Sequence, residues 1–98
     1  MEFSGFDWDD ANREKFRKHG MTIAAIERLF LRGVVVLPDA GHSQRETRLR
    51  AIGRTQDGRT AFVVFTLRDR AGAQLIRPIS ARYMHKKEID RYAETCKA

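Results

Sequence analysis

Arginine side chains recur along the second half of the chain, where strands are expected. They are Arg48 and Arg50 on one predicted strand, Arg68 at the end of the next, and Arg77 and Arg82 along the last. A guanidinium group binds phosphate through two parallel hydrogen bonds and stabilises negative charge that develops during phosphate cleavage. If two or three of these groups converge on one sheet face, the sequence predicts a site that binds phosphate and stabilises the charge that develops on it during cleavage.

Each arginine also has a purely structural explanation. Arg77 or Arg82 could pair with an acid at the edge of the core, such as Asp9 or Glu88. Such pairing would have to hold for all of the arginines at once to remove the predicted site.

Proton transfer needs a second kind of side chain, and one polar connection offers it. Residues 39–46 contain His42, Ser43 and Glu46 within one short loop. A histidine near a carboxylate can act as a proton-transfer pair. The alternative is an ordinary turn in which Asp39 and Ser43 satisfy backbone groups. A serine nucleophile is disfavoured, because the sequence lacks a nucleophile elbow of the Gly-x-Ser-x-Gly type.

A basic turn at Lys18-His19-Gly20 supplies alternative proton carriers. His19 would lie at a helix C-terminus, where the helix dipole favours a cation, so it could serve only as a cap. Tyr83 either packs in the core or stacks on a base.

Charge and composition favour a polyanionic partner. The chain has 98 residues, a net charge of +6, and 14 arginines against 5 lysines. Residues 1–42 hold 6 basic and 7 acidic side chains, whereas residues 43–98 hold 13 and 6. Such a surface attracts nucleic acid or an acidic protein. With a single cysteine, Cys96, the sequence predicts neither an internal disulfide nor a zinc site of paired cysteines.

The length and hydropathy indicate one domain, 1–98, with no membrane span or signal peptide, so we expect a soluble cytoplasmic protein. Acidic residues around Trp8 suit the start of a helix that includes Phe6 and runs to about Lys18, with Gly20 as its cap. Thr22 is the expected N-cap of a second helix that ends at Gly33. A last helix is expected over residues 85–95, with an apolar stripe of Ile89, Tyr92, Ala93 and Cys96.

Between the helices the apolar pattern changes to the two-residue period of strands. We expect four strands, over residues 34–37, 47–53, 61–67 and 75–81, paired mainly antiparallel. The third is apolar on both faces, which is typical of a central strand. Pro78 cannot donate a hydrogen bond to a neighbouring strand, so it should lie at an edge or a bulge. The predicted class is α+β: two N-terminal helices, about four mainly antiparallel strands and a C-terminal helix.

These residues, taken in order, resemble the BrnT family of bacterial type II toxins, whose fold belongs to the RelE-like group of small ribonucleases. The resemblance spans nearly the whole chain and rests on Phe6-Asp7-Trp8-Asp9, Lys18-His19-Gly20, Phe30, Asp39, His42-Ser43, Glu46, Arg48, Ile52-Gly53, Gly58-Arg59, Thr66, Arg68, Ile76-Arg77, Ile79-Ser80-Ala81-Arg82, Glu88 and Tyr92. The chain departs from the family pattern by one residue of spacing before Lys18 and by Pro78. Neither change removes a charged residue from the predicted site.

The resemblance implies an endoribonuclease that inhibits translation and is neutralised by a cognate antitoxin. That antitoxin would carry a ribbon-helix-helix DNA-binding module, and operator DNA would be bound only through the toxin-antitoxin complex. We expect no metal and no cofactor. The expected catalytic residues are Arg68, Arg77 and Arg82 on the phosphate and His42 or Glu46 for proton transfer, with RNA contacts from Lys18, His19, Arg48, Arg50 and Tyr83. The alternative function is a basic binding module that docks an acidic protein or nucleic acid and cuts nothing.

Overall fold

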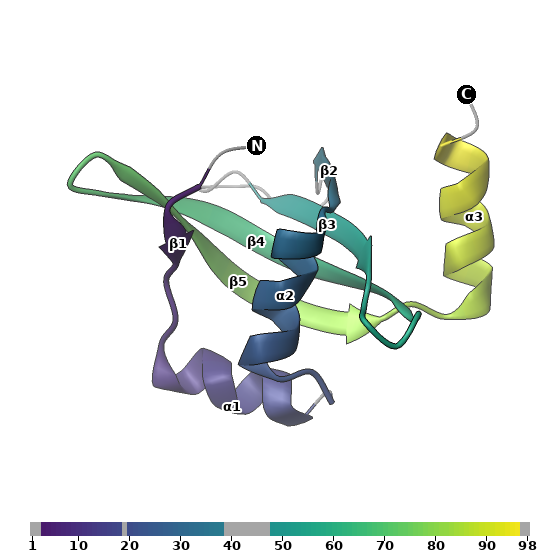
Figure 1. Cartoon of the computed structure of the whole chain (residues 1–98), viewed down its shortest axis with the longest axis horizontal. Helices are drawn as coiled ribbons and strands as arrows, with labels where there is room; N and C mark the ends of the chain where they lie inside the picture. Colours follow the sequence, from purple (N-terminus) through teal and green to yellow (C-terminus); the bar gives the residue numbers. More distant parts are fainter. Residues whose placement is uncertain (1–2, 19, 39–47, 97–98) are drawn as a thin grey trace.

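The computed structural model describes residues 3–18, 20–38 and 48–96 (Figure 1). Its elements are β1 Gly5–Phe6, α1 Asp10–Lys18, α2 Ile23–Arg32, β2 Val35–Pro38, β3 Leu49–Arg54, β4 Thr60–Arg70, β5 Ala73–Tyr83 and α3 Lys86–Cys96. The predicted α+β class is confirmed, with α1 and α2 before strands β2–β5 and α3 after them, although the sheet strand β1 precedes both helices. No helix among the described residues is long and apolar enough to cross a membrane.

The sheet has five strands in the order β1-β5-β4-β3-β2, and every pair except β1 with β5 is antiparallel. The sequence predicted about four strands, and the structure adds the short strand β1. The placement of Phe6 in the first helix is wrong. Instead, Phe6 pairs with Ile76 in the short strand β1, and α1 begins only at Asp10. A strand of two residues is too short to show an alternating apolar pattern in the sequence. It is held by backbone hydrogen bonds at its ends, such as the bond from the Asp7 N–H to the Ile76 carbonyl at 2.8 Å.

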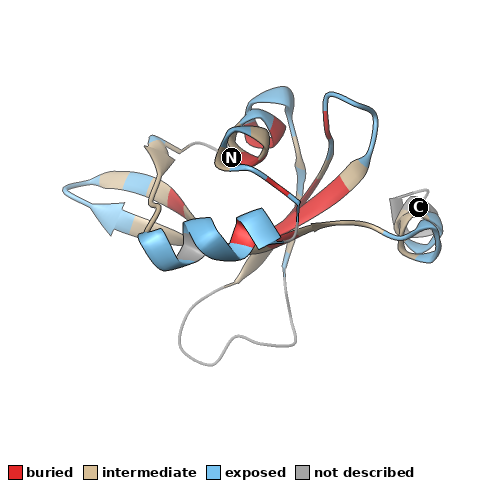
Figure 2. Ribbon diagram, turned by 90° about the horizontal axis from the view of Figure 1, so that it is seen from below, coloured by how far each residue is buried: buried red, intermediate tan, exposed pale blue. Residues whose placement is uncertain are grey.

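The main core lies between the sheet and helices α1 and α2, which both cover the same face (Figure 2). Thr22 caps α2 as predicted, because its hydroxyl accepts a hydrogen bond from the Ala25 N–H at 3.0 Å. The buried α2 stripe includes Phe30, whose ring meets that of Phe65 edge to face at 5.3 Å between centroids. Phe65 is on β4, so the strand predicted to be central does lie at the centre of the sheet.

Pro78 lies at a bulge, in agreement with the sequence. β5 is an interior strand, and its pairing with β4 shifts register between Val64 and Phe65, where Pro78 stands opposite Phe65. The shift accommodates a residue that has no N–H to donate. It also fixes which β5 residues face each side of the sheet beyond the bulge.

A smaller apolar cluster covers the opposite face of the sheet. It consists of Ile52, Phe62 and Val64, with Leu37, Ile79, Met84 and Tyr92 packed against them. Tyr92 belongs to α3, which stands at the end of the sheet apart from α1 and α2 (Figure 1). The predicted packing of α3 through Tyr92 is therefore confirmed, whereas the side chains of Ala93 and Cys96 lie outside the described residues.

Candidate active site

Strand alternation gathers arginines on the sheet face opposite α1 and α2, which we call the arginine face. Core residues Ala51, Val63 and Phe65 point toward the helices, so the residues between them point away. The arginine face comprises Arg50 on β3, Phe62, Val64, Thr66 and Arg68 on β4, and Arg77, Ser80 and Arg82 on β5. Arg48, half-buried, directly precedes β3.

At the α3 end of this face, two arginines share one aromatic ring. The guanidinium carbon of Arg82 lies 4.5 Å from the centroid of Phe62, and that of Arg50 lies 5.0 Å away. Phe62 stands on the central strand, directly opposite Arg82. Each cation is attracted to the electron-rich ring, which places both guanidinium groups next to the same aromatic side chain.

Glu88 fixes the plane of the Arg82 guanidinium. The two carboxylate oxygens of Glu88 accept bonds from Nη1 and Nη2 of Arg82, both at 2.7 Å. Nη1 of Arg82 also donates to the Tyr83 carbonyl at 3.2 Å. The Arg82 side chain nevertheless remains 42% exposed. A phosphate could therefore approach a guanidinium that is already oriented.

The same contacts decide the protonation state of Glu88. Hydrogen bonds from Arg82, and then from the His85 N–H at 3.0 Å, lower the pKa of Glu88 to about 2. The carboxylate in turn raises the pKa of Arg82. A group that is ionised so far below neutral pH is a weak proton acceptor. Glu88 thus serves to position Arg82 and to cap α3.

A hollow of about 220 Å³ opens beside Arg50 and Glu88, between the sheet and α3. Its walls combine aromatic and charged side chains, and it is lined by Leu37, Arg50, Ile52, Phe62, Met84, Glu88, Arg91 and Tyr92. Apolar walls with a few charged groups are typical of small-ligand sites.

Arg77 belongs to a different cluster, at the β1 end of the face. Its Nη1 lies 3.1 Å from the Asp7 carboxylate and its Nη2 lies 2.6 Å from the Asp9 carboxylate. Arg70 joins the cluster through Asp7, at 3.3 Å. This pairing ties the segment between β1 and α1 to β5. The structural explanation offered for Arg77 and Arg82 thus holds in part, because each has acidic partners.

The three arginines assigned to phosphate do not converge on a single point. Five residues separate Arg77 from Arg82, about 16 Å along a strand, and their partners draw them toward opposite ends of β5. Arg68 lies near Arg77, two residues beyond Thr66, which pairs with Arg77. The hydroxyl of Thr66 is buried without a hydrogen-bond partner among the described residues. The face therefore offers two cationic positions, one at each end.

The remaining predicted residues are dispersed. Tyr83 packs against the main core, on the opposite face from Arg82, because consecutive strand residues face opposite sides. Lys18 is exposed at the end of α1, whereas His19, His42 and Glu46 lie outside the described residues. Among the described residues, no three His, Cys, Asp or Glu side chains gather as a metal site would require.

Sequence reasoning missed His85 as a candidate. It precedes α3, and its backbone binds the carboxylate that holds Arg82. The only indication in the sequence that His85 could belong to the site was its position three residues after Arg82.

A family model described as "Ribonuclease toxin, BrnT, of type II toxin-antitoxin system" matches residues 8–88. The chain belongs to the BrnT family. The match includes β4, β5 and Glu88, and so covers both ends of the arginine face. BrnT membership indicates a ribonuclease toxin and implies a cognate antitoxin as partner. No curated protein shows significant similarity to the sequence.

The Glu88 contact gives BrnT stability a pH dependence that can be measured. Because the pKa of Glu88 is lowered from 4.5 to about 2, the contribution of its ion pair with Arg82 to folding stability is complete above about pH 4.5. This contribution disappears as the pH falls toward 2. We therefore expect the stability difference between the wild type and Glu88→Gln to shrink across that window. Urea unfolding of both proteins at several pH values measures it. A difference that stays constant below pH 4.5 would show that the ion pair contributes nothing.

Proposed function

We propose that this toxin is an endoribonuclease that cleaves RNA without a metal ion and thereby inhibits translation. The observation that carries the proposal is the pair Arg50 and Arg82 around Phe62, beside a hollow on the sheet face. Two oriented cations can stabilise the extra negative charge that develops on the phosphorane. The BrnT family match supports the ribonuclease class.

In the proposed reaction the 2′-hydroxyl oxygen attacks the adjacent phosphorus. The O2′–P bond forms and the P–O5′ bond breaks, which leaves a 2′,3′-cyclic phosphate and a free 5′-hydroxyl. A base takes the proton of the 2′-hydroxyl, and an acid returns a proton to the leaving O5′. Arg50 and Arg82 stabilise the extra negative charge on the non-bridging oxygens of the phosphorane.

The other assigned residues take supporting roles in this proposal. Arg68 and Arg77 hold a neighbouring phosphate at the β1 end of the face. His42 and Glu46 remain the proposed proton carriers, with Lys18 and His19 as alternates. His85 is a further candidate, because it precedes the helix whose Glu88 holds Arg82.

Phe62 is proposed to position the two cations. Its ring separates Arg50 on β3 from Arg82 on β5, so that a phosphate can meet both. Each cation–π contact is worth about 0.5–2 kcal/mol.

The cognate antitoxin is proposed to carry a ribbon-helix-helix module and to repress the operon together with the toxin. Toxicity in the cytoplasm then depends on the balance of the two proteins. Induced expression should arrest growth, and co-expression of the neighbouring gene product should relieve the arrest. A chain that never arrests growth would favour the non-enzymatic binding module.

Metal independence gives a direct test of the chemistry. Because arginines supply the cationic charge in the proposed mechanism, the purified protein should cleave RNA at an undiminished rate in EDTA. Gel analysis of a labelled RNA measures the rate, and the products should end in 2′,3′-cyclic phosphate. Cleavage that stops with EDTA and returns with Mg²⁺ would contradict the mechanism.

A further inference from the structure

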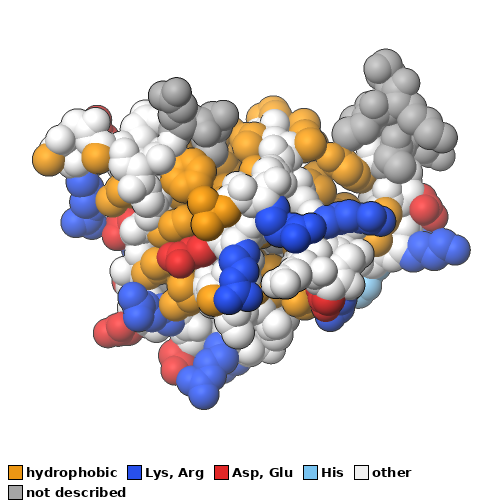
Figure 3. Space-filling model, viewed as in Figure 1, with side chains coloured by type: hydrophobic (Ala, Val, Ile, Leu, Met, Phe, Trp, Pro, Cys, Tyr) orange, Lys and Arg blue, Asp and Glu red, His pale blue; other side chains and the backbone are white. Residues whose placement is uncertain are grey.

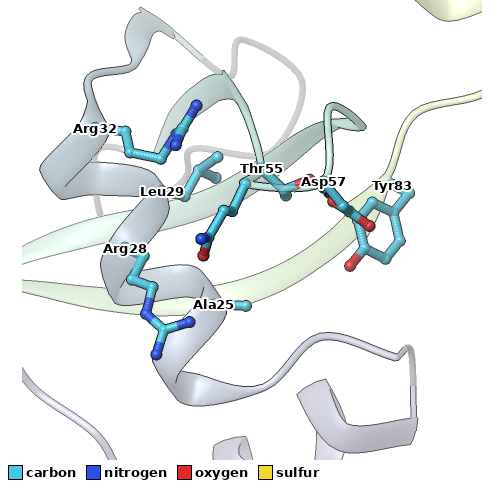
Figure 4. A pocket seen from close by; sticks show the side chains of 8 residues that line it. Ala25, Arg28, Leu29, Arg32, Thr55, Asp57 and Tyr83 are labelled. Atoms are coloured by element: carbon cyan, nitrogen blue, oxygen red, sulfur yellow. Dashed lines mark hydrogen bonds between the residues drawn. The ribbon is translucent and has the colours of Figure 1, made fainter.

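A second hollow lies on the other side of the sheet, against α2 (Figure 4). It has a volume of about 390 Å³. One face of α2 supplies Ala25, Arg28, Leu29 and Arg32 at helical spacing; the turn between β3 and β4 supplies Thr55, Gln56 and Asp57; and the end of β5 supplies Tyr83. Figure 3 shows Lys and Arg side chains lying among hydrophobic ones on this side of the molecule.

The turn that forms one wall is held firmly. The Thr55 N–H donates to the Arg59 carbonyl at 2.8 Å, and the Gly58 N–H donates to the Thr55 carbonyl at 3.0 Å. The Thr55 hydroxyl donates to the Asp57 carboxylate, which is the main reason that the pKa of Asp57 is lowered. The wall therefore presents a fixed carboxylate beside the amide of Gln56.

Tyr83 gives the hollow an aromatic wall. The guanidinium carbon of Arg59 lies 3.4 Å from the centroid of the Tyr83 ring, and Arg59 does not itself line the hollow. The stacked cation fixes the ring orientation. A base could stack on such a ring, as bases do at single-strand-binding sites.

The cationic wall consists of Arg28 and Arg32, four residues apart on α2 and both exposed. Within the part of the chain that the structure describes, neither forms an ion pair with an acid. Like charges at this spacing destabilise a helix slightly, by about 0.2–0.5 kcal/mol. An anion bound between the two guanidinium groups would attract both of them and offset their repulsion.

A third hollow, of about 590 Å³, adjoins both of the others. It shares Ile52 and Tyr92 with the hollow on the arginine face, and it shares Arg32 with the hollow on α2. Arg54 also lines it. The three hollows thus adjoin one another in the order from Arg50 to Arg28, and each is lined by at least one arginine.

We propose that single-stranded RNA runs along these three adjoining hollows and that the α2 hollow holds one nucleotide remote from the cleaved bond. Its phosphate lies between Arg28 and Arg32, and its base stacks on Tyr83 with its edge against Gln56. The inference rests on the proposed RNA cleavage at the arginine face. An acidic peptide fits less well, because Asp57 would repel it, whereas a base or ribose can donate hydrogen bonds to that carboxylate.

Cleavage kinetics on two RNA lengths test this inference. We choose RNAs of about 4 and about 16 nucleotides, the range of single-strand-binding sites, and the double variant Arg28→Ala, Arg32→Ala. The variant should lose about 10-fold or more in kcat/KM on the longer RNA alone, since only that RNA reaches the α2 hollow. The slope of log kcat/KM against log salt concentration for the longer RNA should become shallower by about 0.7, because one phosphate contact is lost.

The matched control is Arg13→Ala, Arg17→Ala, which removes two exposed arginines at the same spacing from α1 and should leave the kinetics unchanged. Equal loss in both double variants, or no loss in either, overturns the inference. So does a variant of Arg28 and Arg32 that cleaves normally but escapes neutralisation by the antitoxin.

Failure of the proposed function has a different signature. A wild type that cleaves neither RNA contradicts ribonuclease activity, and the inference is then judged by binding. Fluorescence anisotropy with an all-2′-deoxy strand of about 16 nucleotides should show weaker binding to the Arg28 and Arg32 variant than to the control. Equal binding would overturn the inference.

Discussion

Replacing Arg82 by alanine is expected to lower kcat for RNA cleavage by about 10²-fold or more, the scale for losing one transition-state donor. Arg82 is proposed to bind the phosphorane more tightly than the ground-state phosphate, so KM should change much less. Single-turnover cleavage of a labelled RNA measures the effect. Arg82→Lys should recover little activity, because an ammonium cannot present the planar fork that Glu88 holds in place.

The matched control for this variant is Glu88→Ala. Either substitution breaks the same ion pair, whose two bonds measure 2.7 Å, but only Arg82→Ala removes the cation. Both variants should therefore melt earlier than the wild type, since both release α3 from β5. Glu88→Ala should nevertheless retain more of its turnover rate than Arg82→Ala, because the guanidinium remains although Glu88 no longer orients it.

Two results would contradict the catalytic assignment of Arg82. If both variants lose stability and activity to the same extent, Arg82 acts only by holding α3. If instead Arg82→Ala weakens RNA binding, by less as salt is raised, and has no separate effect on rate, Arg82 is a docking charge. The second result would favour the non-enzymatic binding module.

The sheet was predictable from the sequence because its signals are local. Leu49 and Ala51 alternate with Arg48 and Arg50, and this alternation alone separates the core face from the arginine face. β4 is buried along most of its length, as a strand that is apolar on both faces should be. By contrast, β1 was missed, because the parallel pairing of Phe6 with Ile76 joins residues far apart in the sequence.

The candidate site was only partly predictable, because partner choice depends on tertiary distance. The sequence left open whether Arg82 pairs with Glu88 or meets phosphate, and α3 brings the carboxylate to it. The sharing of Phe62 by Arg50 and Arg82 requires three adjacent strands in register, which no short pattern specifies. Tyr83 was expected either to pack in the core or to contact RNA, and strand alternation places it against the main core, on the face opposite Arg82.

Arg77→Ala should mainly lower stability, and this is the second large effect that we expect. The variant leaves Asp7, whose side chain is only 14% exposed, without its nearest cation at 3.1 Å. Removing one partner of a fully buried ion pair costs about 3–5 kcal/mol, and partial exposure here reduces the expected loss to about 1–3 kcal/mol. Urea unfolding measures the loss, and kcat/KM should fall with the fraction of folded protein and with the lost phosphate contact.

A triple variant, Asp7→Asn, Asp9→Asn, Arg77→Met, separates the two roles of Arg77. Neutral groups of similar size replace the ion pairs, so much of the stability lost in Arg77→Ala should return, because no charge remains partly buried and unpaired. If Arg77 also holds a phosphate next to the cleaved bond, kcat/KM should stay below the wild-type value even though the protein is folded. Full recovery of both quantities would assign Arg77 to the fold alone, and the phosphate site would then consist of Arg50 and Arg82 around Phe62.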